Sequence, residues 1–256
     1  MKPAIERSVV MSMGGTEDHL FPYLPAIVQD LWELGTIPEG VIALVKKHVP
    51  NWPDIKVLDL GCGKGAVSIR LAKELKCQCH GIDAVKAFIE EAKTKAKEFN
   101  VETHCFFEWG DIRTRIKDLK GFDVVILGSI GPVLGDYYST LTQLSDCVKT
   151  DGYIIIDDAY MDEKESCSNS PGETRSGIME QAAKAGMKLI DEVIIDREKL
   201  KRLNESMYSK IKKRCLELIA LYPEKKRLFI DFLRRQEDEN KILEEKVVCS
   251  TMLFGK

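Results

Sequence analysis

The sequence lacks the features of a membrane-spanning or secreted protein. No stretch of about 18 consecutive apolar residues occurs, which is the length that a helix needs to cross a bilayer. The first residues mix charged side chains with proline and contain no apolar core of the kind found in secretory signals. We therefore expect a cytoplasmic protein without a membrane partner.

An excess of basic charge is also missing. Lys and Arg total 38, Asp and Glu total 41, and the formal net charge is −3. Nucleic-acid binders draw much of their affinity from neutralising phosphates, so they usually carry a basic excess. The balance favours a small or neutral substrate over nucleic acid, although the segment 199–214 is locally basic. Nothing in the sequence assigns an oligomeric state.

The eight cysteines follow no zinc-binding pattern. No C-x-x-C pair occurs, and no histidine stands at zinc-finger spacing from a cysteine. Cys77 and Cys79 lie two positions apart, so on a strand their side chains would face the same way. A metal held by this pair is one interpretation. We favour buried, reduced thiols, because they suit a cytosolic chain.

From Lys56 onwards, short apolar segments alternate with amphipathic ones. The expected strands are 56–60, 78–82, 104–108, 123–127, 153–156 and 188–195. The expected helices are 65–75, 84–99, 136–148 and 173–185. This alternation is typical of an α/β protein with a parallel sheet and helices on both faces. The continuous apolar strands suit a sheet that is buried on both sides.

Helical segments flank this core. Apolar residues recur at helical spacing over 16–34, where Pro22 and Pro25 predict that the helix starts late or is broken. A second helix is expected over 39–49.

Another helical pair, interrupted at Pro223, is expected over 197–240, and 246–254 is expected as a final strand. This pair either packs on the edge of the sheet or covers a substrate pocket. The chain is predicted to be a single domain made of an N-terminal helical cap (1–50), a core (56–196 and 246–254) and the helical insertion (197–240).

A glycine-rich loop follows the first strand, in the sequence Val57-Leu-Asp-Leu-Gly-Cys-Gly-Lys-Gly65. Gly61 and Gly63 allow a tight turn and the close approach of a ligand to the backbone. The helix behind the loop offers unpaired N–H groups at its start. With Ala66, the two glycines also satisfy the dinucleotide pattern G-x-G-x-x-G/A, so the loop alone is compatible with a nicotinamide cofactor.

Asp59 distinguishes the two cofactors. It lies two residues before Gly61, where a carboxylate would repel a pyrophosphate. S-adenosylmethionine carries a sulfonium and an ammonium instead, and attraction to such a charge at about 4 Å is worth roughly 1–4 kcal/mol. Asp83 lies at a fitting distance along the chain to bind a ribose hydroxyl. The loop therefore favours S-adenosylmethionine.

The sequence resembles the class I S-adenosylmethionine-dependent methyltransferases. The segments that carry the resemblance are Asp59-Leu-Gly-Cys-Gly-Lys-Gly65, Gly81-Ile-Asp83, Trp109-Gly-Asp-Ile112, Phe122-Asp-Val-Val-Ile-Leu127 and Asp151-Gly-Tyr-Ile-Ile-Ile156. The resemblance implies a Rossmann-like, seven-stranded, mostly parallel sheet in which the last strand, 246–254, is antiparallel. The layout also resembles a group of uncharacterised bacterial and archaeal methyltransferases, which brings no substrate with it.

The resemblance also implies roles for single residues. Asp83 would take both ribose hydroxyls, and Asp111 would meet the adenine amino group. The implied cofactor-binding residues are Asp59, Gly61, Cys62, Gly63, Asp83, Ala84, Asp111, Ile112, Gly128 and Ser129. Each of the three carboxylates also has a structural explanation, as a cap of the loop, a cap of a helix or a turn residue. All three stand at carboxyl ends of strands, the edge at which parallel sheets bind ligands.

The acceptor site is expected after the fourth and fifth strands. Residues 128–134 lack the Asn or Asp, the proline pair and the aromatic that are typical of methyltransferases for nucleobases or glutamine. Asp157 and Asp158 suggest magnesium, but the acid that metal-dependent catechol-type enzymes need after the fourth strand is missing, so we predict no metal. Asp158 and Tyr160 are the candidate catalytic residues, and Asp157 is expected to end the strand.

His19 and Tyr23 are candidate substrate-binding residues, because the family often folds an N-terminal helix over the cofactor. Surface or core packing also accounts for each. The resemblance implies methyl transfer by in-line displacement to a small-molecule acceptor. One alternative is a protein or RNA methyltransferase, supported by the basic segment 199–214. Another is a non-catalytic S-adenosylmethionine-binding module, because no obligatory catalytic residue defines this fold.

Overall fold

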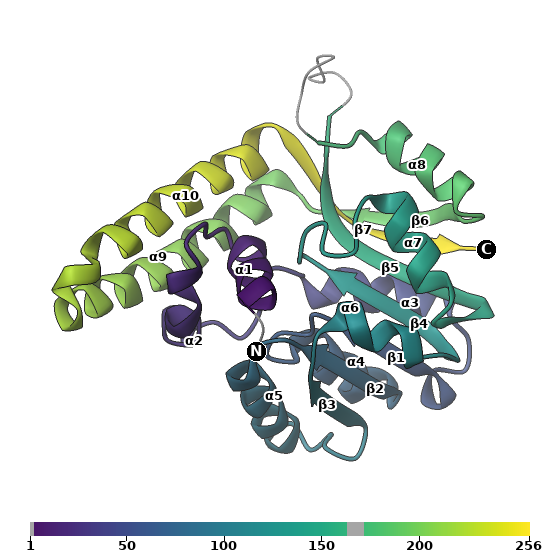
Figure 1. Ribbon diagram of the computed structural model, residues 1–256. Helices are drawn as coiled ribbons and strands as arrows, with labels where there is room; N and C mark the ends of the chain where they lie inside the picture. The colour runs from purple at the N-terminus through teal and green to yellow at the C-terminus, as the bar shows by residue number, and fades with distance from the viewer. Residues whose placement is uncertain (1–2, 163–171) are drawn as a thin grey trace. The chain divides into compact units, whose positions relative to one another are not determined.

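The computed structural model describes residues 3–162 and 172–256, and Figure 1 shows its ribbon. Seven strands form one sheet in the order β3-β2-β1-β4-β5-β7-β6. Their bounds are β1 (Lys56–Leu60), β2 (Gln78–Asp83), β3 (Cys105–Trp109), β4 (Phe122–Gly128), β5 (Val148–Met161), β6 (Lys188–Ile194) and β7 (Val247–Gly255). β1 pairs in parallel with β2 and β4, β2 with β3, and β4 with β5, whereas β7 runs antiparallel to β6. The predicted Rossmann-like sheet is confirmed.

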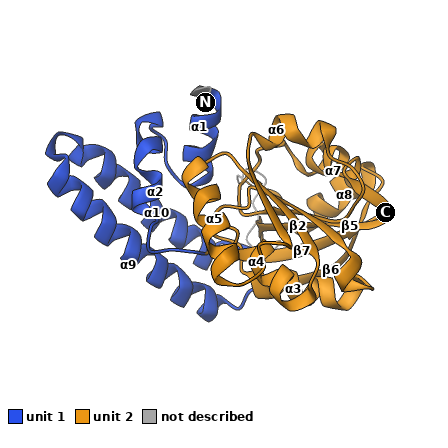
Figure 2. Cartoon of the chain, turned by 90° about the horizontal axis from the view of Figure 1, so that it is seen from below, with its two compact units in different colours: residues 1–32, 195–248 blue, residues 33–194, 249–256 orange. Residues whose placement is uncertain are grey.

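Helices cover both faces of this sheet. They are α3 (Pro38–His48), α4 (Ala66–Leu75), α5 (Lys86–Glu98), α6 (Ile112–Arg115), α7 (Tyr137–Ser145) and α8 (Arg175–Lys184), with the 3-10 helices η2 (Trp52–Asp54) and η3 (Ile116–Asp118). Figure 2 shows α3, α4 and α5 over one face and α6, α7 and α8 over the other. Among the residues described, no helix combines the length and the hydropathy that crossing a membrane requires.

The central strands are buried on both sides. Val124, Val125 and Ile126 of β4 and Ile154 and Ile155 of β5 are at most 1% exposed. Burying an apolar side chain of this size is worth about 1.5–3 kcal/mol. Their unbroken apolar runs are therefore the signature of a sheet between two layers of helices, as predicted.

The predicted helix over 16–34 is wrong in its extent. The segment forms the 3-10 helix η1 (Asp18–Tyr23) and the single turn α2 (Leu24–Ile27). Pro22 and Pro25 lack the backbone N–H that the interior of an α-helix requires, so the segment does not continue as one helix.

Two other elements differ from the prediction. The helix α1 (Pro3–Ser12) forms where none was expected. β5 already begins at Val148, so the helix expected over 136–148 ends at Ser145. β5 also continues to Met161, so Asp157 does not end the strand as predicted, and the register of β5 with β4 is irregular near its start.

The chain divides into two compact units, coloured in Figure 2. One comprises residues 1–32 and 195–248, and the other comprises 33–194 and 249–256. The long helices of the first unit are α9 (Arg197–Leu221) and α10 (Lys226–Glu245), with η4 (Pro223–Lys225) between them. Pro223 thus stands at the break between two helices. Their role as a cap over a pocket stays a prediction.

Candidate functional site

The glycine-rich loop joins β1 to α4 at the carboxyl edge of the sheet. Gly61, Gly63 and Gly65 have φ angles of 74°, 52° and 76°, in the left-handed region that favours glycine. The amides of Gly61 and Cys62 donate to the carbonyl oxygen of Ile82 at 2.8 and 3.1 Å. The loop is therefore fixed to the end of β2, beside the second predicted motif.

Two apolar side chains pack against the loop. A Cβ atom at Gly61 would lie 2.8 Å from Cγ2 of Ile130, and one at Gly63 would lie 3.3 Å from Cδ1 of Leu34. Ile130 follows β4 and Leu34 precedes α3. Glycine is thus required here for close packing as well as for the backbone angle.

Asp83, the last residue of β2, holds the loop in place. Its buried carboxylate accepts hydrogen bonds from the amide of Gly63 at 2.8 Å and from the amide of Val85 at 2.7 Å. Removal from water raises the pKa of Asp83 to about 6, against the lowering effect of the two amides. Asp83 does not cap α5, because the N-cap of that helix is Val85 and no side chain caps it. Each carboxylate oxygen still has a second lone pair for another donor.

Asp59 lies one residue before the end of β1 and is 4% exposed. Its Oδ2 accepts a 2.6 Å hydrogen bond from the hydroxyl of Ser68 on α4. Burial raises the pKa of Asp59 to about 6, and the nearby charge of Asp83 acts in the same direction. Two carboxylates on neighbouring strands therefore stand close enough to influence each other. A cation bound beside them would stabilise their ionised forms.

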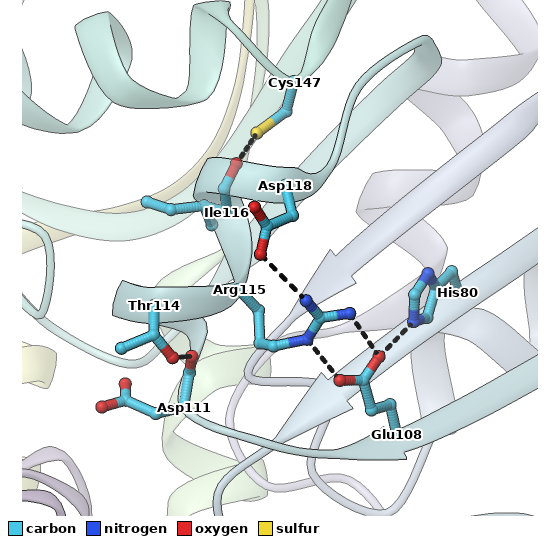
Figure 3. A network of polar contacts seen from close by, with 8 residues as sticks. All are labelled: His80, Glu108, Asp111, Thr114, Arg115, Ile116, Asp118 and Cys147. Carbon is cyan, nitrogen blue, oxygen red and sulfur yellow. Dashed lines mark hydrogen bonds and ion pairs between the residues drawn. The ribbon is translucent and has the colours of Figure 1, made fainter.

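Asp111 follows β3 and caps the start of α6. Its carboxylate accepts from the amide of Arg113 at 3.1 Å and pairs with the guanidinium of that residue at 2.9 Å. Its carbonyl oxygen accepts from the hydroxyl of Thr114 at 2.9 Å, as Figure 3 shows. Asp111 thus has a structural role in the turn between β3 and α6. A contact of Asp111 with adenine stays a prediction.

A polar network braces this turn (Figure 3). The guanidinium of Arg115 contacts both carboxylate oxygens of Glu108 on β3 and reaches Asp118 at 3.4 Å. Nε2 of His80 on β2 lies 3.2 Å from the same Glu108 carboxylate. Hydrogen bonding to Arg115 lowers the pKa of Glu108, so this carboxylate is ionised at neutral pH. The network ties β2, β3 and α6 together on either side of Asp111.

The segment after β4 meets the chain that precedes α3. Ser129 has a φ of 52°, and its hydroxyl donates to Asp157 at 2.7 Å. The hydroxyl of Thr36 donates to that of Ser129 at 3.2 Å, and the hydroxyl of Thr251 donates to Asp157 at 2.5 Å. A Cβ atom at Gly128 would collide with Thr36. Burial raises the pKa of Asp157, against the lowering effect of these hydroxyls.

The two candidate catalytic residues bind different partners. Asp158 accepts a 3.1 Å hydrogen bond from the hydroxyl of Tyr137 on α7. Tyr160 donates to Glu192 on β6 at 3.3 Å, and Glu192 also pairs with Arg175 at 2.6 Å. Tyr160 is 5% exposed, and burial raises its pKa to about 12. The contacts of Tyr160 are those of a packing residue, and catalysis by either residue stays a prediction.

His19 and Tyr23 belong to the unit that contains α9 and α10. The ring of Tyr23 packs edge-on against Tyr222 and Phe229, with centroid distances of 5.4 and 5.2 Å. His19 lies in η1. Packing within this unit accounts for Tyr23, and a substrate contact for either residue stays a prediction.

Three further residues were predicted to bind the cofactor. Cys62 lies in the glycine loop, Ala84 directly follows β2, and Ile112 begins α6. Cys62 and Ile112 are buried. The carbonyl oxygen of Ala84 accepts from Nε1 of Trp109 at 3.0 Å.

Cys77, which directly precedes β2, and Cys79, on β2, have side chains on the same side, as predicted. The sulfur atoms of Cys77 and Cys79 lie 3.7 Å apart in the buried interior. Cys167 lies outside the described residues. Within the described part of the chain, no group of three or more His, Cys, Asp or Glu gathers as a metal site would require.

Three partners in this region had no signal in the sequence. Thr36 precedes Ser129 by 93 residues, and Thr251 follows Asp157 by 94 residues. Tyr137 precedes Asp158 by 21 residues. These three residues reach Ser129, Asp157 and Asp158 only through the folded arrangement: Thr36 precedes α3, Tyr137 is on α7 and Thr251 is on β7.

Comparison with known proteins gives the family. A family model described as a methyltransferase domain matches residues 52–244, which is most of the chain. The chain belongs to this methyltransferase family. The resemblance drawn from the motifs is therefore confirmed.

Curated relatives match parts of the methyltransferase. The (+)-O-methylkolavelool synthase of Herpetosiphon aurantiacus is 29% identical over 89 residues, 35% of this chain and 31% of that protein. The malonyl-[acyl-carrier protein] O-methyltransferase of Bacillus cereus is 27% identical over 117 residues, 45% of this chain and 42% of that protein. The chain thus spans less than half the length of the curated relatives that it matches.

Solved structures share the fold of this chain over most of its length. An S-adenosylmethionine-dependent methyltransferase of Geobacter sulfurreducens, in complex with S-adenosylhomocysteine, has a TM-score of 0.75 at 17% identity and covers 91% of this chain and 97% of its own. The corresponding complex from Thiobacillus denitrificans has a TM-score of 0.74 at 19% identity and covers 90% and 96%. Both confirm the class of fold.

The glycine loop of the chain fits S-adenosylmethionine. Asp83 has lone pairs left for two ribose hydroxyls while it keeps the amides of Gly63 and Val85. The buried carboxylate of Asp59 suits a cationic ligand and opposes a pyrophosphate.

Proposed function

We propose that the protein is a cytoplasmic S-adenosylmethionine-dependent methyltransferase that acts on a small-molecule acceptor. The observation that carries the proposal is the pair of buried carboxylates, Asp59 and Asp83, beside the glycine loop. Burial raises the pKa of each to about 6, so a cationic ligand that stabilises the ionised forms gains affinity from both. A pyrophosphate would be repelled at the same place, which argues against a nicotinamide cofactor.

When bound, the cofactor would supply a methyl group on a sulfonium sulfur; the acceptor's nucleophile would bond to the methyl carbon as the carbon–sulfur bond breaks, and neutral S-adenosylhomocysteine would leave. The protein's own task is to align the two reactants and to exclude water. Asp83 and the amide of Gly63 hold the cofactor loop. Asp158 is the proposed base, taking the proton from an acceptor whose nucleophile must lose one. Burial raises the pKa of Tyr137, so its phenol stays protonated and orients the Asp158 carboxylate.

The distribution of charge supports a small acceptor. The net charge is −3, and the basic segment 199–214 is partly neutralised, since Arg214 pairs with Asp30 and with Glu217 at 2.6 Å each. Two curated relatives named as O-methyltransferases support oxygen as the acceptor atom. The free cysteines of the described residues, five of them buried, support a reducing compartment such as the cytoplasm.

Calorimetric titration of cofactor-stripped protein with S-adenosylmethionine, S-adenosylhomocysteine and NADH tests the proposal. We expect both adenosyl ligands to bind with a Kd of about a micromolar and NADH not to bind. Asp83→Ala should weaken adenosyl binding by at least ~tenfold. Tight NADH binding without adenosyl binding would contradict the proposal.

A second assay identifies the acceptor. Formation of S-adenosylhomocysteine is followed while a panel of alcohols, phenols, carboxylic acids and amines is offered to the protein. Turnover that falls with added salt and needs RNA or protein as acceptor would argue for a macromolecular substrate instead.

A further inference from the structure

The connection between α9 and α10 exposes apolar side chains to solvent. Leu221 ends α9 and is 70% exposed, the largest value among the large apolar side chains of the described residues. Tyr222 and Pro223, which follow it, are exposed as well, and Leu216 on α9 is 52% exposed. Figure 1 shows α9 and α10 side by side, so these four residues lie at the closed end of a helical hairpin. We call them the apolar tip.

The apolar tip lies outside the buried face of α9. Ile211, Cys215 and Leu218 are buried and recur at the spacing of one helix face. Leu216 stands between them in the sequence and therefore points away from that face. Its leucine side chain adds little to the core. Exposed apolar residues that adjoin one another and have a polar rim mark a contact with another surface.

Basic side chains surround the apolar tip. Residues 210–227 hold seven Lys and Arg against two Glu, a formal charge of +5 in a chain whose total is −3. Lys212 and Lys213 precede Leu216 by four and three positions, so they are its neighbours on the helix surface. Lys226 begins α10 directly after the connection, and all three lysines are exposed. The tip is thus apolar in its middle and basic at its rim.

This combination fits the surface of a membrane that contains anionic lipids. Leucine and tyrosine side chains enter the boundary between headgroups and acyl chains, while lysines around them attract the lipid phosphates. A nucleic acid also offers phosphates, but its backbone gives an aliphatic tip nothing to bury against. We expected no membrane partner because the sequence has no long apolar run. That argument concerns a spanning segment, and a contact at the membrane surface needs none.

We infer that the apolar tip docks the protein reversibly on an anionic membrane surface. Leu216 and Leu221 enter the interface, and the lysines of the rim supply the electrostatic attraction. This inference does not rest on the proposed function, since the tip holds no residue of the cofactor loop.

Sedimentation of the full chain with lipid vesicles tests the inference. The vesicles consist of phosphatidylcholine alone or of equal parts of phosphatidylcholine and phosphatidylglycerol. We expect binding to the anionic vesicles only, and weaker binding as salt is added. Leu216→Ser combined with Leu221→Ser should weaken binding at least ~tenfold. Lys212→Gln combined with Lys213→Gln and Lys226→Gln should weaken it about a hundredfold.

The chain offers a matched control for each set. Ile242→Ser removes an apolar side chain that is 47% exposed on α10, far along the helix from the connection. Lys199→Gln combined with Lys201→Gln and Arg202→Gln removes three exposed charges from the start of α9. That end of the helix lies beyond the distance of about 10 Å over which charges act at 0.1 M salt. Both control proteins should bind nearly as tightly as the wild type.

The outcomes that would overturn the inference differ from these in kind. Failure to bind either vesicle, or equal binding to both, would exclude an anionic membrane as the partner. Binding that depends on the lysines, ignores the two leucine substitutions and is displaced by soluble heparin would identify a polyanion site instead. Circular dichroism of each variant checks that the fold is kept, as expected for exposed side chains.

Discussion

The hydroxyl of Ser129 donates a 2.7 Å hydrogen bond to Oδ2 of Asp157, and this bond joins the carboxyl end of β4 to the interior of β5. Ser129 makes it from a φ of 52°, a conformation that costs a non-glycine residue about 1–3 kcal/mol. Hydrogen bonding to a buried carboxylate offsets this strain. The end of β4 is thereby fixed to β5 beside Asp158, the proposed base.

Substitution of Ser129 separates the strain from the hydrogen bond. Ser129→Ala keeps the left-handed backbone and removes the donor, so we expect the free energy of unfolding to fall by about 1–3 kcal/mol. Ser129→Gly also removes the donor but relieves the strain, so its loss should be smaller by about 1 kcal/mol. Urea denaturation followed by circular dichroism compares the two. Equal losses would show that the backbone angle carries no strain.

Binding of S-adenosylmethionine should tighten between pH 5 and pH 7. In the free protein the pKa values of Asp59 and Asp83 are raised to about 6, so both carboxylates are protonated at the lower pH. A bound sulfonium favours the ionised forms, and protons are released on binding near pH 6. Calorimetry at pH 6 in two buffers of different ionisation enthalpy measures the release. S-adenosylhomocysteine should release fewer protons, and equal release by the two ligands would count against a sulfonium beside these residues.

Asp59→Asn should stabilise the free protein at pH 7. The folded pKa of about 6 lies above the ordinary value of 3.8, so the contribution of Asp59 to stability is full below about pH 3.8 and is lost as the pH rises through 6. At pH 7 asparagine removes a buried charge and keeps an acceptor for Ser68, a gain on the order of 2 kcal/mol. Thermal unfolding should show this gain at pH 7 and much less at pH 4. The same variant should bind S-adenosylmethionine more weakly.

Gly61→Ala should harm both the fold and cofactor binding. The φ of 74° strains an alanine, and its Cβ would lie 2.8 Å from Ile130. We expect a loss of about 1–3 kcal/mol in the free energy of unfolding and at least ~tenfold weaker binding of S-adenosylmethionine. Gly121→Ala is the control, because its φ is 79° but nothing lies within 4 Å of its Cβ. That variant should lose only the strain energy, with cofactor affinity unchanged.

Measurements of kcat and of the free energy of unfolding distinguish the roles of Asp158 and Tyr160. Asp158→Asn should lower kcat by at least ~tenfold without changing the affinity for S-adenosylmethionine. Tyr160→Phe should lower the free energy of unfolding by about 1 kcal/mol, because it removes the hydrogen bond to Glu192, and leave kcat unchanged. Initial rates of S-adenosylhomocysteine formation with the acceptor found in the panel measure the first effect. The opposite pattern would move the base to Tyr160.

Local patterns predicted the positions at which the chain turns. The first strand ends at Leu60, as expected, because a glycine loop follows an apolar run there. Asp83 is the last residue of β2, and Asp111 follows β3 as the N-cap of α6. The N-terminal segment was predicted less well, because its apolar spacing suited a helix that Pro22 and Pro25 do not allow to continue.

Contacts between distant segments had no such signal. Tyr160 and Asp158 are equivalent in the sequence, two residues apart on one strand, and only their partners distinguish them. Glu192 lies 32 residues beyond Tyr160 and comes into contact with it through the sheet. Lys64 in the glycine loop likewise pairs with Glu91 on α5, a contact that no pattern in the sequence indicates.

The strand order has a consequence for folding of the chain during its synthesis. β7 lies between β5 and β6, yet it is synthesised last of the three, after α9 and α10 have emerged. Until it emerges, β6 has no neighbour in the sheet and β5 presents a long open side to other nascent chains. The helices α9 and α10 contact each other along their length, so they have time to pair before the sheet is completed. A chain truncated just before Val247 and released from the ribosome should therefore form the helical hairpin and carry a sheet that aggregates.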